Sequence, residues 1–290
     1  MPTATLERPA PRATATGPGT APTPAPLVPD ALDPIGLDDL NAAAAMLARV
    51  DRKYVLTRDE AAEVAARLHP GTRVLQIGRV RAHSYESVYF DTPGLDAFRM
   101  TASPRRRRFK IRTRAYLDSS LAFLEVKTRG GRGLTLKERL PYGPDDAAAA
   151  RLTDEGRRWA SAVLSGIGYE DRAAASLAPV LRGSYRRTTL LLAGSQGRAT
   201  LDSDLSWVDL RLRERPDGPG AGRPAGRLEA PGLVIIETKS GSSPSDLDRA
   251  LWRCGHRPAR ISKYATALAA LDPSLPRNRW HRTLPRLVAA

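Results

Sequence analysis

The chain has 290 residues, which is enough for one large domain or two small ones with a buried core. Its formal net charge of +15 favours an acidic partner, such as nucleic acid, an anionic membrane or a polyphosphorylated ligand. A single cysteine, Cys254, excludes an intrachain disulfide, and neither a membrane-helix stretch nor a signal-peptide core is visible, so a cytoplasmic protein without a transmembrane segment is expected.

The composition divides the chain into three parts. Residues 1–29 are mainly Pro, Ala, Thr and Gly and are expected to be a disordered leader. One domain is expected over residues 30–272, followed by a basic tail over 273–290. Residues 214–231, rich in Pro and Gly, are expected to be a mobile loop.

Periodicity and turn residues predict eight strands and five helices within the domain. Thr57 followed by Glu60 is a capping-box pattern that predicts a helix start. The helices are expected at about 37–50, 57–68, 145–167, 244–253 and 262–271. The strands are expected at about 53–56, 83–90, 106–116, 121–129, 134–140, 180–192, 198–210 and 233–239.

Charged residues alternate with apolar ones along at least four of these strands. Successive side chains of a strand point to opposite faces, so each such strand has one charged and one apolar face. A charged face that is simply wet would explain one or two strands. A sheet curled with its charges inward, as in a barrel with a water-filled interior, explains the whole pattern better. The positions that alternate are Arg108, Lys110, Arg112 and Arg114; Glu125, Lys127 and Arg129; Lys137 and Arg139; Glu237 and Lys239.

All six lysines lie in these strand-like charged segments, whereas the arginines are scattered through the chain. Where Arg is the default solvated cation, Lys is retained where a compact ammonium with three donors does something that a guanidinium cannot. Chance retention is the alternative. The pattern favours a site built from several strands for a polyanion, because phosphate chains need positive charge from several directions.

Two glutamates lie among these cations. A carboxylate in such a place can hold a hard divalent ion that bridges phosphate oxygens. We expect Glu237, which lies in an otherwise apolar strand, to be a metal ligand, and Glu125 is a second candidate. A local ion pair with Lys239 or Lys127 is the alternative for each, and it competes most strongly for Glu125.

Taken in order, the charged segments resemble the VTC-domain polyphosphate polymerases, members of the CYTH-like triphosphate tunnel fold. The resemblance covers about residues 35–272 and implies an α+β protein in which an eight-stranded antiparallel β-barrel tunnel has helices packed outside. The matching segments are 51–54, 88–92, 110–114, 123–128, Lys137, 185–187, 200–202, 236–239 and 262–264.

The resemblance also implies the roles of single residues. Glu237, with Glu125 as the second candidate, would hold Mn²⁺ or Mg²⁺. Either Arg186 or Arg187 would join the phosphate ligands, and the expected register favours Arg187. Lys110 would bind substrate only. The residues expected to bind substrate and to act in catalysis are Lys53, Arg112, Arg114, Lys127, Lys137, Arg187, Lys239 and Lys263.

The implied reaction is transfer of the terminal phosphoryl group of ATP to a growing polyphosphate chain. Asp51 and Lys53 stand in the first strand where the broader superfamily often has alternating glutamates, which favours the polymerase branch over cyclases and hydrolases. Two alternatives stay open: a tunnel triphosphatase with water as acceptor, and a binding module for polyphosphate or nucleotides without turnover. A nucleic-acid binder is disfavoured, because the four Phe and four Trp are dispersed.

Two further expectations concern partners. The chain lacks the membrane helices and regulatory domain of the eukaryotic polymerase complexes, so a separate membrane protein is a possible partner. The run Arg105–Arg108 is expected to gather anions at the tunnel mouth, with a solvated turn and a nucleic-acid patch as alternatives.

Overall fold

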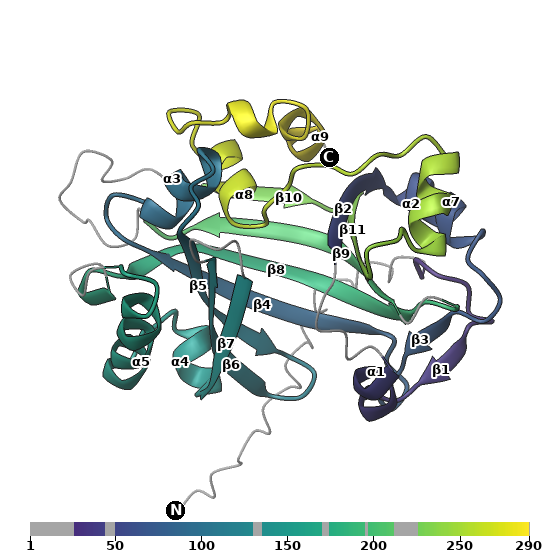
Figure 1. Cartoon of the computed structure of the whole chain (residues 1–290), viewed down its shortest axis with the longest axis horizontal. Helices are drawn as coiled ribbons and strands as arrows, with labels where there is room; N and C mark the ends of the chain where they lie inside the picture. The colour runs from purple at the N-terminus through teal and green to yellow at the C-terminus, as the bar shows by residue number, and fades with distance from the viewer. Residues whose placement is uncertain are drawn as a thin grey trace, which may run out of the picture.

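A computed structural model of the protein describes residues 26–43, 50–129, 135–169, 174–194, 197–211 and 226–289. Its centre is one antiparallel sheet with helices on the outside and at one end (Figure 1). The predicted α+β class and the eight main strands are confirmed. In spatial order these strands are β2 (Val50–Thr57), β11 (Leu233–Ser240), β9 (Arg198–Asp209), β8 (Ala178–Leu191), β4 (Ala82–Asp91), β5 (Arg108–Tyr116), β6 (Leu121–Arg129) and β7 (Thr135–Tyr142).

The sheet is curled but not closed. β2 and β7 end the path of strands and do not pair with each other within the described residues. Lys53 of β2 is nevertheless close enough to Lys127 of β6 for its charge to lower the pKa of Lys127, after the larger effect of burial. The interior is therefore a tunnel open along one side, where the edge strand β7 is largely exposed.

Three short strands extend the sheet. β1 (Asp33–Ile35) pairs in parallel with β3 (Arg73–Leu75), which pairs with β8. β10 (Arg227–Ala230) pairs with β9, so the end of the predicted 214–231 loop is a strand, whereas residues 214–225 lie outside the described residues. β1 and β3 were not predicted, since three residues are too few to show alternation.

Helices cover the apolar outer face of the sheet. Residues such as Leu124 and Val126 of β6 pack in one core cluster with Ala160 and Leu164 of α5. Val234 and Ile236 of β11 belong to a second cluster with residues of α2 and α7. The helices are α1 (Leu37–Ala43), α2 (Arg58–Ala65), α3 (Asp96–Ala102), α4 (Pro144–Ala148), α5 (Asp154–Ser165), α7 (Asp246–Arg253), α8 (Ala265–Leu271) and α9 (Leu284–Val288), with the 3₁₀ turn η1 (Asn278–Trp280). None of the helices in the described part of the chain is long and apolar enough to cross a membrane.

Several helix predictions need correction. The capping box of α2 is confirmed, with Thr57 Oγ1 accepting from Glu60 N at 3.1 Å. The single helix predicted over 145–167 is wrong: Ala150 adopts a left-handed φ of 58°, and Thr153 caps the new helix α5. The helix predicted over 37–50 ends at Ala43; residues 44–49 lie outside the described residues, and β2 begins at Val50.

Both ends of the domain extend further than expected. Leu27 and Val28, at the end of the predicted leader, are buried, while residues 1–25 lie outside the described residues. The segment expected as a basic tail contains η1 and α9, and its Trp280 is only 1% exposed. Trp280 contacts Phe98 of α3, with ring centroids 6.0 Å apart, so this segment packs on the domain.

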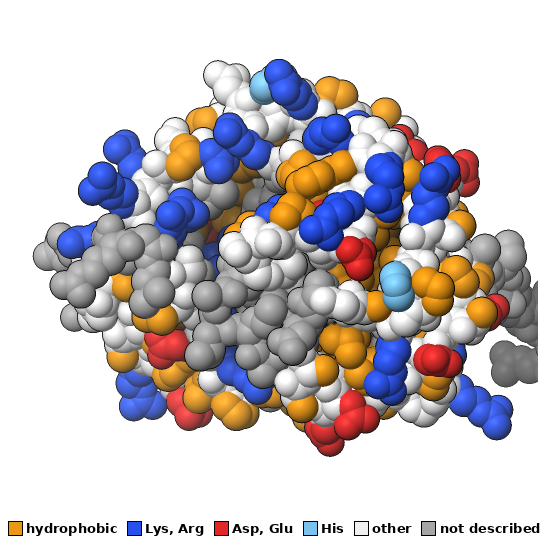
Figure 2. Space-filling view, turned by 45° about the vertical axis from the view of Figure 1, so that its right-hand side comes forward, with side chains coloured by type: hydrophobic (Ala, Val, Ile, Leu, Met, Phe, Trp, Pro, Cys, Tyr) orange, Lys and Arg blue, Asp and Glu red, His pale blue; other side chains and the backbone are white. Residues whose placement is uncertain are grey.

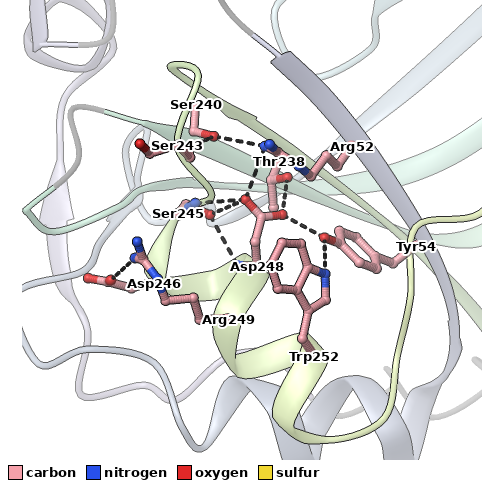
Figure 3. A network of polar contacts seen from close by, with 10 residues as sticks. All are labelled: Arg52, Tyr54, Thr238, Ser240, Ser243, Ser245, Asp246, Asp248, Arg249 and Trp252. Carbon is pink, nitrogen blue, oxygen red and sulfur yellow. Dashed lines mark hydrogen bonds and ion pairs between the residues drawn. The ribbon is translucent and has the colours of Figure 1, made fainter.

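A buried carboxylate joins α7 to the outer face of β2 and β11 (Figure 3). Asp248 accepts hydrogen bonds from Tyr54 Oη and Thr238 Oγ1, each at 2.7 Å, and from Ser245 N and Oγ, each at 2.8 Å. Arg52 Nη1 lies 3.5 Å away. Because Thr238 points outward to this network, its neighbours Glu237 and Lys239 point inward.

A second buried carboxylate positions the segment before α8. Asp91 accepts from the backbone N–H groups of Ala97 and Phe98 at the start of α3, each at 2.9 Å, and from Tyr264 Oη at 2.6 Å. The ring of Tyr264 stacks on Tyr89 of β4, with centroids 5.1 Å apart. Residues 262 and 263 are thereby brought over the inner face of the sheet.

Candidate functional site

The strand register places the predicted site residues of the sheet on one face. Cross-strand partners point to the same side, so the ladder can be followed from strand to strand. Lys53 lies opposite Glu237, Arg187 opposite Asp202, and Arg112 opposite Glu125. The predicted residues on this inner face are Lys53, Lys110, Arg112, Arg114, Glu125, Lys127, Lys137, Arg187, Glu237 and Lys239. Lys263 reaches the same face from the segment before α8.

Register also separates Arg187 from Arg186. Arg187 pairs with Asp202 and with His83 on the inner face, whereas Arg186 pairs with Ser203 and Ser84 on the other face. The favoured choice, Arg187, is therefore the one that lies inside the sheet. Its role as a phosphate ligand stays a prediction, as it does for the other residues of the inner face.

Glu125 is held by three cations. Arg112 donates from Nε at 2.8 Å and from Nη2 at 2.7 Å to one carboxylate oxygen, and Lys137 Nζ donates at 2.6 Å to the other. Arg114 Nη1 lies 3.8 Å away. Burial acts to raise the pKa of Glu125, but these charges outweigh it and hold the pKa far below its usual range. Glu125 is therefore ionised, and both of its carboxylate oxygens already accept hydrogen bonds from cations.

Asp202 forms a second closed ion pair that the sequence reasoning did not assign. Arg187 binds both oxygens of this carboxylate: its Nε donates to Oδ1 at 2.6 Å and its Nη2 donates to Oδ2 at 2.9 Å. Lys263 Nζ also donates to Oδ2. Burial would raise the pKa of Asp202, yet Arg187 and Lys263 lower it well below the ordinary value. The sequence did offer a signal for Asp202, because it lies in segment 200–202, one of the segments that match the VTC-domain polymerases.

Glu237 differs from these two carboxylates. Within the described residues it accepts no hydrogen bond, and its ion pair with Lys239 Nζ is long, at 3.9 Å. Burial acts to raise its pKa, but the charges of Lys53, Lys239 and Arg187 outweigh burial, so Glu237 is ionised. Its oxygens are hard ligands with open lone pairs, surrounded by cations.

A divalent ion fits this place as a partner of one carboxylate. No group of three or more His, Cys, Asp or Glu side chains in the described part of the chain could enclose a metal. Mg²⁺ and similar ions, however, often bind through one or two carboxylates and take their other ligands from water and substrate phosphates. The unengaged carboxylate of Glu237 meets this requirement, whereas both oxygens of Glu125 are occupied by cations.

The lysines of the inner face repel one another. Lys110, Lys127 and Lys137 are directly opposite in three adjacent strands, and Lys110 Nζ donates to Ser262 Oγ at 3.0 Å. Burial, followed by the charges of Lys53 and Arg112, lowers the pKa of Lys110 well below its ordinary value. Burial likewise lowers the pKa of Lys239 to about 8. A bound polyanion would relieve this repulsion.

Two tyrosine rings of the inner face make cation–π contacts with Arg187 and Lys263. Tyr85 and Tyr185 stack with centroids 5.4 Å apart, and the guanidinium of Arg187 lies 5.2 Å from each ring. Lys263 Nζ lies 4.7 Å from the ring of Tyr185. Such contacts stabilise a cation without neutralising it. Sequence reasoning missed Tyr85, because nothing in an alternating strand distinguishes a supporting ring from a core residue.

Comparison with solved structures finds similar chains, and three of them are described here. A putative adenylate cyclase from Bacillus halodurans is 14% identical, over 74% of this chain and 94% of that chain, with a TM-score of 0.44. A putative adenylyl cyclase from Hippeastrum, described as having a dominant triphosphatase activity, is 15% identical over 76% and 95%, with a TM-score of 0.44. A conserved hypothetical protein from Pyrococcus furiosus is 13% identical over 74% and 98%, with a TM-score of 0.36.

Among curated proteins no match is found. The family described as the VTC domain matches residues 48–272, a range that contains every inner-face residue named above. That range is most of the 290-residue chain. The chain therefore belongs to the VTC-domain family.

Proposed function

We propose that this protein is a metal-dependent polyphosphate polymerase that uses ATP. The terminal phosphoryl group of ATP would pass to a terminal oxygen of a phosphate chain. The bond between the γ-phosphorus and the β–γ bridging oxygen breaks, a new P–O bond forms at the acceptor, and ADP leaves with the electron pair of the broken bond. The observation that carries the proposal is that Lys and Arg side chains from strands on both sides of β4 lie on the one inner face of the sheet.

The arrangement of cations on this face supports a phosphate chain as the ligand. Cations extend from Lys53 and Lys239 at one side of the sheet to Lys110, Lys127 and Lys137 at the other. Few carboxylates oppose them in the described residues, and Glu125 and Asp202 are already paired. The curl of the sheet brings Lys53 near Lys110 and Lys127, so a phosphate chain lying in the interior would meet positive charge from several sides.

The residues of the chain act by positioning and by charge. Lys53, Lys110 and Lys127 supply point charges, and Arg112 and Arg187 supply planar forks once phosphate oxygens compete with Glu125 and Asp202 for them. Donors held in place can align the two substrates and offset the negative charge that develops on the transferred group. Glu237 would hold Mn²⁺ or Mg²⁺, which when bound supplies positive charge that bridges phosphate oxygens.

The test is to incubate the purified protein with ATP and Mn²⁺ and to resolve the phosphate products by chain length. A ladder of chains that grows with time, with one ADP released per phosphate added, is expected. ADP with orthophosphate alone would assign the triphosphatase activity instead. Tight binding of ATP or polyphosphate without release of ADP or phosphate, with Mg²⁺ as well as Mn²⁺, would leave a binding module.

Partner and location belong to the same proposal. A separate membrane protein is a possible partner, with no partner needed as the alternative, and the cytoplasm is the expected location. Co-purification of the protein from detergent-solubilised membranes and from the soluble fraction of its own cells, quantified side by side, tests both.

A further inference from the structure

The segment after residue 272 lies beyond the part of the chain that matches the VTC domain, yet it packs firmly. Trp280, Leu284 and Leu287 are buried in the main core cluster. Thr283 Oγ1 donates to the backbone carbonyl of Arg260 at 3.2 Å, which ties the segment to the loop between α7 and α8. In Figure 1, α9 and α8 lie together above the sheet, near α3.

This segment completes a cluster of four arginines. Arg108 and Arg129 are cross-strand partners at the ends of β5 and β6. Burial, then the charges of Arg129 and Arg279, lowers the pKa of Arg108, and burial followed by Arg260 lowers the pKa of Arg279. Within the described residues, the charges that act on Arg108 and Arg279 are those of other arginines. We call Arg108, Arg129, Arg260 and Arg279 the arginine cluster.

A cavity adjoins the arginine cluster. It has a volume of about 340 Å³ and lies between the end of α3 and the C-terminal segment, with Arg279 shared between cavity and cluster. Hydroxyl, amide and guanidinium donors line it, which are the groups that bind phosphate oxygens. The lining residues are Ala102, Ser103, Ser274, Leu275, Pro276, Arg277, Asn278 and Arg279.

The arginine cluster is continuous with the inner face. Arg108 precedes Lys110 by two residues, and Arg129 follows Lys127 by two, so both pairs point to the same side of the sheet. The charge of Arg108 also contributes to the depressed pKa of Lys110. Figure 2 shows Lys and Arg side chains spread over the upper part of the face in view, the level at which α8 and α9 lie in Figure 1.

We propose that the arginine cluster and its cavity form a second polyanion site, which holds the part of a polyphosphate chain that extends beyond the inner face. This inference rests on the proposed function, because it takes the inner face to hold the reacting end of the same chain. A single-stranded nucleic acid fits less well: none of the lining residues is aromatic, so the site offers no platform for bases.

The experiment compares a cluster variant with a charge-matched control. Arg260→Ala/Arg279→Gln removes two charges from the arginine cluster. Arg253→Ala/Arg282→Ala removes two exposed charges that do not belong to the arginine cluster, one at the end of α7 and one in the C-terminal segment itself. Affinities for tripolyphosphate, for polyphosphate of roughly one hundred units and for a thymidine oligonucleotide are measured without ATP or metal at several salt concentrations.

The cluster variant is expected to bind long polyphosphate at least ~10-fold more weakly, because two charge-assisted contacts are lost. Its affinity for tripolyphosphate should stay within about twofold, and its salt slope should fall by about 2. The control should resemble the wild type. Equal losses in both variants, equal losses for short and long chains, or an oligonucleotide that binds as tightly as polyphosphate would each overturn the site.

Failure of this inference is distinguishable from failure of the proposed function. If the wild type does not bind tripolyphosphate, the inner face is not a phosphate site and the proposed function fails. If tripolyphosphate binds and a ladder forms from ATP, but the cluster variant binds long chains normally, only the second site fails. Thermal unfolding of each variant checks that the C-terminal segment remains folded.

Discussion

At the scale of single residues, Glu237, Glu125 and Asp202 of the inner face differ in what already binds their oxygens. Glu237 has open oxygens, whereas Glu125 and Asp202 are bound by cations. Glu237→Gln removes a negative ligand with little change of shape, so we expect weaker Mn²⁺ dependence and a fall in turnover of at least ~10². Mn²⁺ binding in the presence of tripolyphosphate gives a readout independent of turnover.

The control for Glu237 is Glu229→Gln, at a strand position whose side chain is 56% exposed. It should leave both readouts unchanged. Wild-type turnover by Glu237→Gln at saturating Mn²⁺ would instead assign Glu237 to a structural ion pair with Lys239.

Two cations of the inner face should respond differently to truncation. Lys127 reaches solvent and, within the described residues, donates no hydrogen bond to a carboxylate, so Lys127→Ala is expected to weaken tripolyphosphate binding by about 1.5 to 3 kcal/mol with little change in stability. Arg112 donates two hydrogen bonds to the buried Glu125, so Arg112→Ala should also lower the free energy of unfolding by at least about 2 kcal/mol. Urea unfolding and calorimetric titration of both variants measure this contrast, and equal stability losses would contradict it.

The sequence predicts which face of the sheet a side chain takes wherever charged and apolar residues alternate along a strand. The two-residue period placed Lys110, Arg112 and Glu125 on the right face, because parity follows from the chain alone. Cross-strand register does not follow from the chain alone. The pairs Arg112–Glu125 and Arg187–Asp202 were therefore missed, and with them the fact that Glu125 is engaged.

At the scale of elements, the Asp248 network should fix α7 and β11 together. Asp248→Asn replaces an acceptor of four hydrogen bonds by an amide with one carbonyl oxygen, leaving buried donors without partners. We expect the free energy of unfolding to fall by about 1 to 3 kcal/mol. Asp246→Asn, on the same helix, is the control, because its pair with Arg249 is half-exposed and should contribute less than about 1 kcal/mol. Similar losses in the two variants, measured by urea unfolding, would contradict a special role for Asp248.

Elements were predictable where periodicity runs for several turns or residues. All eight main strands and the start of α2 follow from local signals. The break between α4 and α5 was missed because alanines at 147–150 fit a helix locally, whereas Ala150 is left-handed and Arg151 N donates to Asp146 O, which ends α4. The fold of the C-terminal segment depends on burial of Trp280 against α3, a contact between residues distant in sequence.

At the scale of the whole molecule, the inner face makes stability depend on a ligand. The folded-state pKa of Lys239 is about 8, lower than the ~10.4 of a free lysine, mainly because of burial. Between these values the unfolded chain binds more protons than the folded one, so stability rises with pH. Below pH 8 the cost of the charged, buried Lys239 is fully present, and a bound polyanion should reduce it.

Tripolyphosphate should therefore raise the Tm more at pH 7 than at pH 9.5. The reason is that lysines with a lowered pKa, such as Lys239, are charged at the lower pH and lose charge at the higher one. Near pH 8 its binding should take up about half a proton at Lys239 alone, since the anion moves that pKa back toward ~10.4. Titration calorimetry in two buffers of different ionisation enthalpy measures the uptake, and Lys239→Gln should reduce it. A Tm shift that is independent of pH, together with no proton uptake, would mean that the anion binds away from the lysines of the inner face.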